Sequence, residues 1–283
     1  MGANVTIAIV LAAGKGTRMR SALPKVSHKV AGLPMIAHVH AAISGVPGLT
    51  PMYVLGHGQD IVRGLLPEDV QCVIQTQQLG TGHAVGVALE ALPDDCSEVM
   101  VMYGDMPLLT SVTLRGLQEQ HRAQNAVLTL LSATVGEPFG YGRIIRDEQG
   151  RPVSITEEKW LSAEQRQIQE INTGVYTIDV EWLRNTLPTL PRHGDDEIYL
   201  TDLAAAAAKL NKLLVVPNAA HDEVVGINDR VGLAQAEQIM RRRINETLMR
   251  GGVTLIDPTA TYIAADAVIG ADTIIEPNVI IDT

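Results

Sequence analysis

Short apolar runs alternate with amphipathic stretches along the first half of the chain. The pattern predicts strands at 5–11, 52–55, 70–75 and 99–103, and helices at 35–43, 59–66 and 81–92. Strands that alternate with helices in this way are typical of a parallel sheet with helical crossovers. The stretch 126–178 carries more strand-like runs and fewer helices, so we expect it to add a substrate-side region to the same sheet. The pattern predicts an α/β domain with a mixed, mostly parallel sheet.

A long helical pattern follows at 228–250 and ends at Gly251-Gly252, a helix stop. One predicted face of this helix is apolar and consists of Leu233, Ala236, Met240, Ile244 and Leu248. We interpret it as a linking helix that closes a first domain spanning 1–227.

The pattern changes again after the helix, where isoleucines recur at six-residue intervals at positions 263, 269, 275 and 281. A small or acidic residue follows each isoleucine, as in the hexapeptide repeat of a parallel β-helix. The alternative is a chance run of isoleucines in an ordinary sheet. So few repeats do not bury a core of their own. We therefore expect 251–283 to be the truncated start of a longer β-helix, or to depend on the first domain or on an oligomer.

Composition narrows the function classes. The chain has 283 residues, 46% hydrophobic and 3% aromatic, with a mean hydropathy of +0.12, so its core is expected to be aliphatic. A formal charge of −10 argues against a nucleic-acid partner but allows a small phosphate-bearing substrate. Cys72 and Cys96 offer neither a disulfide framework nor zinc spacing, and Cys72 is expected to be a buried, inert thiol. No signal peptide or membrane span is indicated, which predicts a cytoplasmic protein without a membrane partner.

The turn after the first strand carries the first candidate chemistry. It reads Leu-Ala-Ala-Gly-Lys-Gly-Thr-Arg-Met from Leu11, and Pro24-Lys25 follows shortly. Two glycines let backbone N–H groups approach phosphate oxygens, and Arg18 and Lys25 add positive charge. The stretch is neither a Walker A loop nor a dinucleotide fingerprint. Taken alone, it suits a phosphate loop or an ordinary turn between a strand and a helix.

Two further positions are candidate metal ligands. Asp105 follows a predicted apolar strand, and ligands of open parallel sheets bind at the carboxyl ends of the strands. A carboxylate there suits Mg²⁺, which needs few protein ligands beside substrate phosphates. The alternative for Asp105 is a helix cap or turn residue. Asn228, just before the long helix, is a second candidate, and its alternative is also a helix cap, a role open to Asp229.

The segment from Gln75 to Ala84, Gln-Thr-Gln-Gln-Leu-Gly-Thr-Gly-His-Ala, suggests a base site. Uracil presents an N–H donor between two carbonyl acceptors, which the Gln75 amide and the backbone near Gly80 can match. Thymine fits this chemistry equally well, and a plain polar turn remains an alternative.

Together these motifs support a resemblance to known families. The loop with Thr-Arg-Met and Pro-Lys resembles the signature of sugar-1-phosphate nucleotidylyltransferases. The segments 75–84, 140–144, 157–159, 167–174 and 199–202 look like those of the bacterial bifunctional N-acetylglucosamine-1-phosphate uridylyltransferases. The likeness spans essentially the whole chain. It implies a Rossmann-like nucleotide-diphospho-sugar transferase domain, a linking helix and the first turns of a left-handed β-helix. The chain departs from that family at 192–197, where the family has an Asn-rich loop, and the difference affects the rim of the sugar pocket.

The resemblance also implies roles for individual residues. Arg18, Lys25 and Asp105 would be catalytic, and Asp105 and Asn228 would hold Mg²⁺. Substrate would be bound by Leu11, Ala12, Ala13, Gly14, Lys25, Gln75, Gly80, Thr81, Tyr103, Gly104, Asp105, Gly140, Glu157, Asn172 and Asn228.

The implied reaction transfers UMP from UTP to N-acetylglucosamine 1-phosphate, giving UDP-N-acetylglucosamine, a cell-wall precursor, and pyrophosphate. The intact parent protein would also acetylate glucosamine 1-phosphate with acetyl-CoA, through a site expected beyond this chain, and would trimerise through the β-helix. Two alternatives remain: another sugar-1-phosphate nucleotidylyltransferase, or a non-catalytic regulatory subunit of the same fold.

Overall fold

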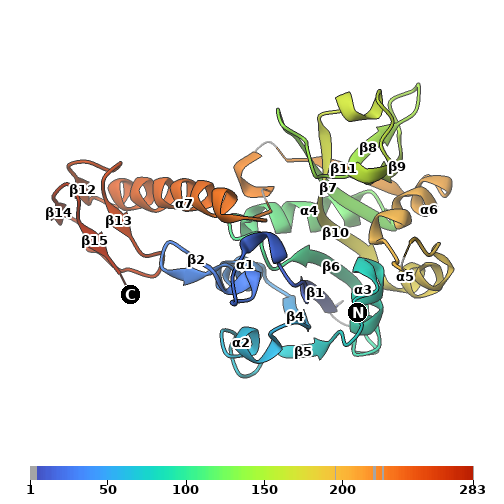
Figure 1. The fold of residues 1–283 in the computed structure, drawn as a ribbon, viewed down its shortest axis with the longest axis horizontal. Coiled ribbons are helices and arrows are strands. Elements are labelled where there is room, and N and C mark those ends of the chain that lie inside the picture. The colour runs from blue at the N-terminus through green and yellow to red at the C-terminus, as the bar shows by residue number, and fades with distance from the viewer. Residues whose placement is uncertain (1–4, 195, 219–220, 225, 283) are drawn as a thin grey trace.

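The computed structural model describes residues 5–194, 196–218, 221–224 and 226–282. Within these residues nine strands form one large sheet, in the order β11-β7-β10-β6-β1-β4-β5, with β8 paired to β10 and β9 paired to β8 (Figure 1). The strands are β1 Val5–Ala12, β4 Leu49–Leu55, β5 Gln71–Ile74, β6 Cys96–Tyr103, β7 Leu128–Thr134, β8 Arg143–Arg146, β9 Pro152–Thr156, β10 Glu170–Asp179 and β11 Leu213–Pro217.

The sheet is mixed in direction. Strands β5, β4, β1 and β6 run parallel, as do β7 and β11, whereas β10 runs antiparallel between β6 and β7. The mixed, mostly parallel sheet predicted from the sequence is therefore confirmed. The carboxyl ends of β1 and β6 lie side by side, which brings the two segments that follow them together.

Helices cover both faces of the sheet. Alternate side chains of β1 point to opposite faces and pack into two different apolar clusters. Ile7, Ile9 and Leu11 pack into one buried apolar cluster, while Ala8 and Val10 pack into the other. The first cluster includes α3 Gly80–Leu89, α5 Val180–Thr186 and α6 Leu203–Lys209, and the second includes α1 Met35–Ser44, α2 Gln59–Arg63 and α4 Ser111–Ala123.

Two predicted helices extend too far. Helix α2 ends at Arg63, where Gly64 caps it, and α3 runs from Gly80 to Leu89 instead of 81–92. Pro93 accounts for part of the second difference, because Leu92, the residue before this proline, disfavours helical backbone. Cys72 is half-buried on β5 rather than buried, and burial still raises the pKa of its thiol, which keeps it unreactive.

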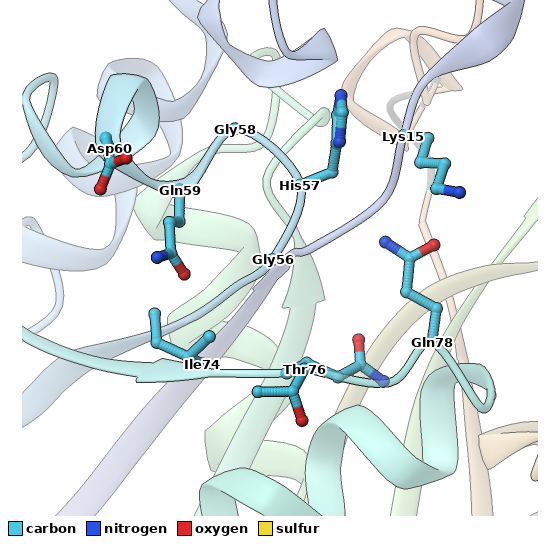
Figure 2. A pocket seen from close by; sticks show the side chains of 10 residues that line it. Lys15, Gly56, His57, Gly58, Gln59, Asp60, Ile74, Thr76 and Gln78 are labelled. Carbon is cyan, nitrogen blue, oxygen red and sulfur yellow. The ribbon is translucent and has the colours of Figure 1, made fainter.

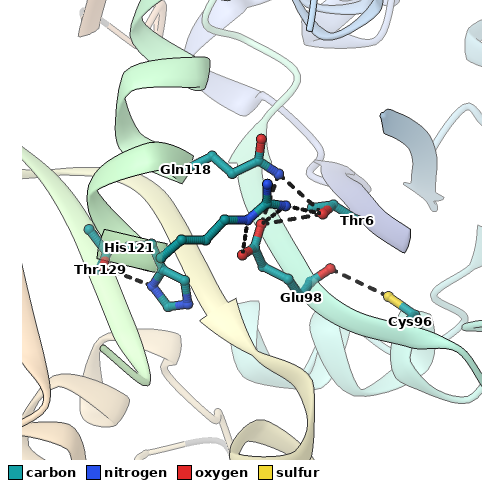
Figure 3. A network of polar contacts seen from close by, with 7 residues as sticks. Thr6, Cys96, Glu98, Gln118, His121 and Thr129 are labelled. Carbon is teal, nitrogen blue, oxygen red and sulfur yellow. Dashed lines mark hydrogen bonds and ion pairs between the residues drawn. The ribbon is translucent and has the colours of Figure 1, made fainter. Parts of the chain in front are cut away.

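A buried polar network ties α4 to the amino ends of β1 and β6 (Figure 3). The Glu98 carboxylate accepts hydrogen bonds from Thr6 at 3.3 Å and from Gln118 at 2.8 Å. Arg122 completes the network with an ion pair to Glu98 at 3.1 Å and a hydrogen bond to Thr6 at 3.0 Å. Since a buried carboxylate is costly unless it is paired, these partners fix the position of α4 on the sheet.

Helix α7 Arg230–Arg250 extends from the main sheet to the C-terminal coil (Figure 1). Its first half packs Ala236 with Ile227, and its second half packs Ile244 and Leu248 with the coil. The coil contains β12 Thr254–Leu255, β13 Tyr262–Ile263, β14 Ile274–Ile275 and β15 Ile280–Ile281.

The coil has the geometry of a β-helix. Strand β12 pairs in parallel with β14, and β13 pairs in parallel with β15, so that Ile263 lies opposite Ile281, three hexapeptides later. Ile263 and Ile275 are buried within the coil, as the repeat predicted. The division of the chain at 227 and 250 stays a prediction, although α7 itself begins and ends close to those positions.

A hairpin from the first domain also contacts the coil. Strands β2 Lys29–Val30 and β3 Leu33–Pro34 flank Ala31 and Gly32. The N–H of Ala265 donates to the carbonyl of Ala31 at 2.9 Å, and the N–H of Ala31 donates to the Glu237 carboxylate at 2.6 Å. Among the described residues, no helix has the length and apolar character needed to cross a membrane.

Candidate active site

Two cavities meet at the carboxyl ends of β1 and β6. The first, of 390 Å³, lies between the loop after β1 and the start of α3, and the second, of 240 Å³, lies toward β8, β9 and β10. Lys25, Tyr103 and Asp105 line both cavities. The predicted substrate residues divide between them. Leu11, Ala12, Ala13, Gly14, Gln75, Gly80 and Thr81 line the first, Gly140, Glu157, Asn172 and Asn228 line the second, and Gly104 lines neither. From the roles that the sequence predicts for these residues, we name the first the nucleotide cavity and the second the acceptor cavity.

The two glycines of the loop after β1 do different things. Gly16 has φ +59°, and a Cβ placed there would lie 2.6 Å from the Cβ of Lys25. Gly16 is therefore what allows Lys25 to approach the loop. A Cβ at Gly14 would meet nothing within 4 Å, so its backbone faces open space at the nucleotide cavity. Gly104 packs behind the loop, and its N–H donates to the carbonyl of Leu11 at 3.0 Å.

Four charged or polar side chains converge where the cavities meet. The Lys25 ammonium forms an ion pair with the Asp105 carboxylate and lies 3.2 Å from the Asn228 amide oxygen. Arg18 donates to the same Asn228 oxygen at 2.9 Å. The segment carrying Asn228 is fixed nearby, because the N–H of Ile227 donates to the carbonyl of Asp105 at 3.1 Å. Arg18 and Lys25 from the loop after β1, and Asp105 after β6, therefore converge on the same place between the two cavities.

Neither Asp105 nor Asn228 is needed as a helix cap. The next helix after Asp105 is α4, and Thr110 caps it by accepting from the N–H of Thr113. Asp229 caps α7 by accepting from the N–H of Gly232 at 2.9 Å. The helix-cap alternatives for Asp105 and Asn228 are therefore wrong, whereas Asp105 does lie in a turn after β6, as its other alternative had it. Both side chains remain available to the site.

The oxygens of Asp105 and Asn228 suit a hard divalent cation. Both contact the Lys25 ammonium, so they already point at one cationic centre. Mg²⁺ prefers such oxygen ligands and usually takes only one or two from the protein when phosphates supply others. Across the described part of the chain, no cluster of three or more His, Cys, Asp or Glu residues forms an all-protein metal cage. The donor set fits Mg²⁺ bound together with a phosphate substrate.

The nucleotide cavity is closed at its far end by Gln75 and Gly80. Gly80 has φ +91°, and a Cβ there would lie 2.5 Å from the carbonyl oxygen of Ile198, so only glycine fits. Gly80 begins α3, which leaves its backbone N–H without an acceptor inside the helix. Gln78, which the sequence reasoning did not single out, donates to the carbonyl of Ala13 at 2.8 Å and joins the wall to the first loop.

The acceptor cavity is lined by groups suited to a neutral polar ligand. Thr201 donates to the Glu157 carboxylate at 2.8 Å, and the Asn172 amide donates to the hydroxyl of Tyr176 at 2.7 Å. Burial raises the pKa of Glu157, while the hydrogen bond from Thr201 opposes that shift. Gly140 has φ +86° with open space around its Cβ position. Such scattered hydrogen-bonding groups match sugar hydroxyls, which carry no charge.

Tyr103 forms the wall between the cavities. Gly174 has φ +83°, and a Cβ there would come within 2.1 Å of the Tyr103 ring. Only a glycine at position 174 leaves room for the Tyr103 ring. The sequence pattern did not indicate this contact.

The loop that departs from the family pattern lies at the rim. His193 and Glu197 exchange backbone hydrogen bonds of 2.8 Å, and the imidazole of His193 contacts the Asp202 carboxylate at 2.8 Å. The His193 ring also lies 4.7 Å from that of Trp160. Glu197 and Tyr199 both reach the nucleotide cavity. Within the altered loop 192–197, Glu197 lines the nucleotide cavity and none of the described residues lines the acceptor cavity, so the expected effect on the sugar pocket stays a prediction.

The two sides of the site are hydrogen-bonded to one another. The N–H of Gly82 donates to the carbonyl of Ile198 at 2.8 Å, and the N–H of Ile198 donates to Leu79 at 2.9 Å. The N–H of Leu200 donates to the hydroxyl of Thr81 at 3.0 Å. The loop beside the nucleotide cavity and the segment that carries Thr201 therefore form one connected unit.

A further recess of 680 Å³ shares Gln75 and Gln78 with the nucleotide cavity. Figure 2 shows Lys15 and Gln78 on one side of it, the turn from Gly56 to Asp60 above and Ile74 and Thr76 below. It is larger than either cavity, but it contains neither Asp105 nor any of the three residues that converge with it, Arg18, Lys25 and Asn228. The chemistry therefore belongs to the smaller cavities.

The fold and the converging cations define a nucleotidyltransferase. The chain belongs to the family of MobA-like NTP transferase domains, whose model matches residues 8–165. A solved structure from Bacillus anthracis, named a "Putative Glucose-1-Phosphate Thymidylyltransferase", shares the fold with a TM-score of 0.67 over 83% of this chain and 95% of that one. It is 19% identical, so the comparison concerns the fold alone.

More similar relatives share the name bifunctional protein GlmU. The one from Caldanaerobacter subterraneus subsp. tengcongensis is 44% identical over 276 residues, which cover 97% of this chain and 60% of the relative. The one from Lactococcus lactis subsp. lactis is 47% identical over 272 residues, covering 94% of this chain and 58% of the relative. The family resemblance drawn from the sequence is confirmed, and the chain spans about 60% of the length of these relatives.

Proposed function

We propose that the chain transfers UMP from UTP to N-acetylglucosamine 1-phosphate, forming UDP-N-acetylglucosamine and releasing pyrophosphate. The observation that carries the proposal is the convergence of Arg18, Lys25, Asp105 and Asn228 between two cavities. The resemblance of the base and sugar segments to the uridylyltransferases supplies the choice of substrates. Because UTP and sugar phosphates are cytoplasmic metabolites, the activity is a cytoplasmic one.

In this reaction a phosphate oxygen of the sugar phosphate attacks the α-phosphorus of UTP. A new P–O bond forms as the bond to the bridging oxygen of the β-phosphate breaks, and pyrophosphate leaves. The attacking phosphate is already ionised near neutral pH, so the site needs no general base. Catalysis then comes from positioning and from neutralising negative charge.

The chain's own cations supply part of that neutralisation. In the protein alone Lys25 neutralises Asp105, and its flexible stem lets the ammonium turn toward a phosphate. Arg18 is exposed at the cavity edge and can hold the departing pyrophosphate through several N–H donors. Mg²⁺ held by Asp105 and Asn228 would add positive charge beside the reacting phosphates.

The test is release of pyrophosphate by the purified chain with UTP, N-acetylglucosamine 1-phosphate and Mg²⁺. A panel of other nucleotides and of glucose and mannose 1-phosphates runs in parallel. We expect the named pair to react fastest, and Arg18→Ala to slow the reaction about 100-fold. Arg20→Ala is the matched control, since Arg20 is also exposed but lines neither cavity.

Other results would replace the proposal. A faster reaction with a different pair would make the chain another member of the nucleotidylyltransferases. No pyrophosphate release, together with no Mg²⁺-dependent binding of UTP, would make it a non-catalytic regulatory subunit.

We further propose that the coil joins three copies of the chain; the number three comes from the trimer that the family resemblance implies for the intact parent protein. Its outward side chains include large apolar groups that are strongly exposed, Val268 at 98%, Ile274 at 64% and Ile280 at 74%. Contiguous exposed apolar groups favour association. Sedimentation equilibrium should give the mass of a trimer, and a monomeric mass at micromolar concentration would refute this part.

A further inference from the structure

His83, which contacts the side chain of Gln75, leads to an inference about base selection. This inference rests on the proposed function. The Gln75 side-chain nitrogen lies 3.3 Å from the carbonyl oxygen of Gly80 and 3.0 Å from Nδ1 of His83. Gln75 itself is 6% exposed and lines the nucleotide cavity. Its amide is therefore held by two partners on α3 and does not rotate freely in solvent.

These contacts determine which way the amide faces. A carbonyl oxygen only accepts hydrogen bonds, so the atom of Gln75 that faces Gly80 must be the NH₂ group. The second N–H of that group then donates to Nδ1 of His83, which makes His83 the acceptor and places its ring proton on Nε2. His83 is half-buried and its ring also borders a 410 Å³ groove on the outer side of α3, where that proton can meet water.

With both N–H groups committed, the amide oxygen is the one group that Gln75 offers to a ligand. Within the described residues, no donor is bonded to that oxygen. An acceptor at this position matches the N3–H of uracil, and it repels the N3 lone pair of cytosine. The backbone N–H of Gly80, free at the start of α3, adds a donor for a uracil carbonyl oxygen.

We propose that His83 is a positioning residue for base selection: by accepting from Gln75, it holds the amide in the orientation that selects uracil over cytosine. His83 does not touch the base. Without it only the Gly80 carbonyl, 3.3 Å from the amide nitrogen, still opposes rotation, so the amide turns its NH₂ group toward the cavity more often, and this orientation suits N3 of cytosine. Thymine carries the same N3–H as uracil, so His83 does not separate these two bases.

The experiment compares kcat/KM for UTP, CTP and TTP, with N-acetylglucosamine 1-phosphate as the acceptor. His83→Ala should lower the UTP-to-CTP preference by roughly 10- to 100-fold, the loss expected for one buried hydrogen bond. The UTP-to-TTP ratio should stay within about twofold of the parent value. His83→Asn should restore most of the preference for UTP over CTP, because the Asn side-chain oxygen lies as many bonds from the backbone as Nδ1 of His.

Two controls separate positioning from a structural role. His57→Ala changes a histidine that lines the further recess but neither the nucleotide cavity nor the acceptor cavity, and it should leave both ratios unchanged. In a Gln75→Ala background, removal of His83 should have no additional effect on the UTP-to-CTP ratio, because the side chain on which it acts is gone. An additional loss there would overturn the proposal.

Failure of this inference is distinct from failure of the proposed function. A parent protein that does not prefer UTP over CTP would refute the proposed uridylyl transfer. A parent that prefers UTP, with a His83→Ala variant of equal preference, would refute only the role of His83. A His83→Asn variant that behaves like His83→Ala would also overturn it, since an acceptor at that place would then be without effect.

Discussion

The contrast between Gly14 and Gly16 gives the sharpest test of how the first loop works. In Gly16→Ala the new methyl group would lie 2.6 Å from the Cβ of Lys25 and 3.4 Å from its Cα, at a backbone φ of +59°. The left-handed backbone costs an alanine about 1 kcal/mol, and the overlap with a stem close to the main chain adds about 1–3 kcal/mol. We therefore expect a loss of about 2–4 kcal/mol in the free energy of unfolding.

Gly14→Ala is the matched variant. Its φ lies outside the left-handed region and its methyl group meets nothing within 4 Å, so we expect stability within about 0.5 kcal/mol of the parent. Its methyl group would still project into the nucleotide cavity and weaken UTP binding. Urea unfolding followed by circular dichroism measures stability, and calorimetric titration measures UTP binding. The reasoning fails if Gly16→Ala is as stable as the parent, or if Gly14→Ala binds UTP with unchanged affinity.

Three further perturbations probe other parts of the molecule. Asp105→Asn should reduce turnover by at least about 100-fold with little change in melting temperature, because a neutral amide is a weaker ligand than a carboxylate for the Mg²⁺ proposed at this site; near-parent pyrophosphate release would contradict this. Glu98→Leu should lower the free energy of unfolding by about 2 kcal/mol and leave UTP affinity unchanged. This loss is small for a broken buried ion pair, because the Arg122 side chain is half-exposed and regains contact with water. Burial raises the pKa of Glu157 above its ordinary 4.5. Ionisation of this carboxyl is therefore less favourable in the folded protein than in the unfolded chain, and the free energy of unfolding falls as pH rises from 4.5 through the raised pKa. Glu157→Gln should therefore be more stable than the parent at neutral pH, with the difference vanishing below pH 4.5; melting curves across pH would show no such trend if Glu157 were solvated.

Local patterns predicted much of the fold. The apolar run of β1 is buried on both faces because helices cover both sides of the sheet, and residues 263 and 275 are buried where the six-residue repeat placed them. The antiparallel insertion of β10 between β6 and β7 was not predictable, because strand order depends on which surfaces meet in three dimensions.

The site was partly predictable for similar reasons. Motif resemblance indicated Arg18, Lys25, Asp105 and Asn228, and the structure brings them together, although their roles remain predictions. Contacts with distant partners left no local signal. Gln118 occupies a polar position on an amphipathic helix, where a solvent-facing side chain is the usual expectation, yet it is buried against Glu98.

The hydrogen bonds between residues 79–82 and 198–200 have a consequence for both cavities. A base that pushed Gly80 outward would press on Ile198, whose carbonyl oxygen faces it, and the hydrogen bond between Leu200 and Thr81 would carry the displacement toward the neighbouring Thr201. Thr201 in turn holds Glu157 in the acceptor cavity. The two cavities are thus joined by one hydrogen-bonded segment, so we expect a change of position at Gly80 to reach Glu157 in the acceptor cavity.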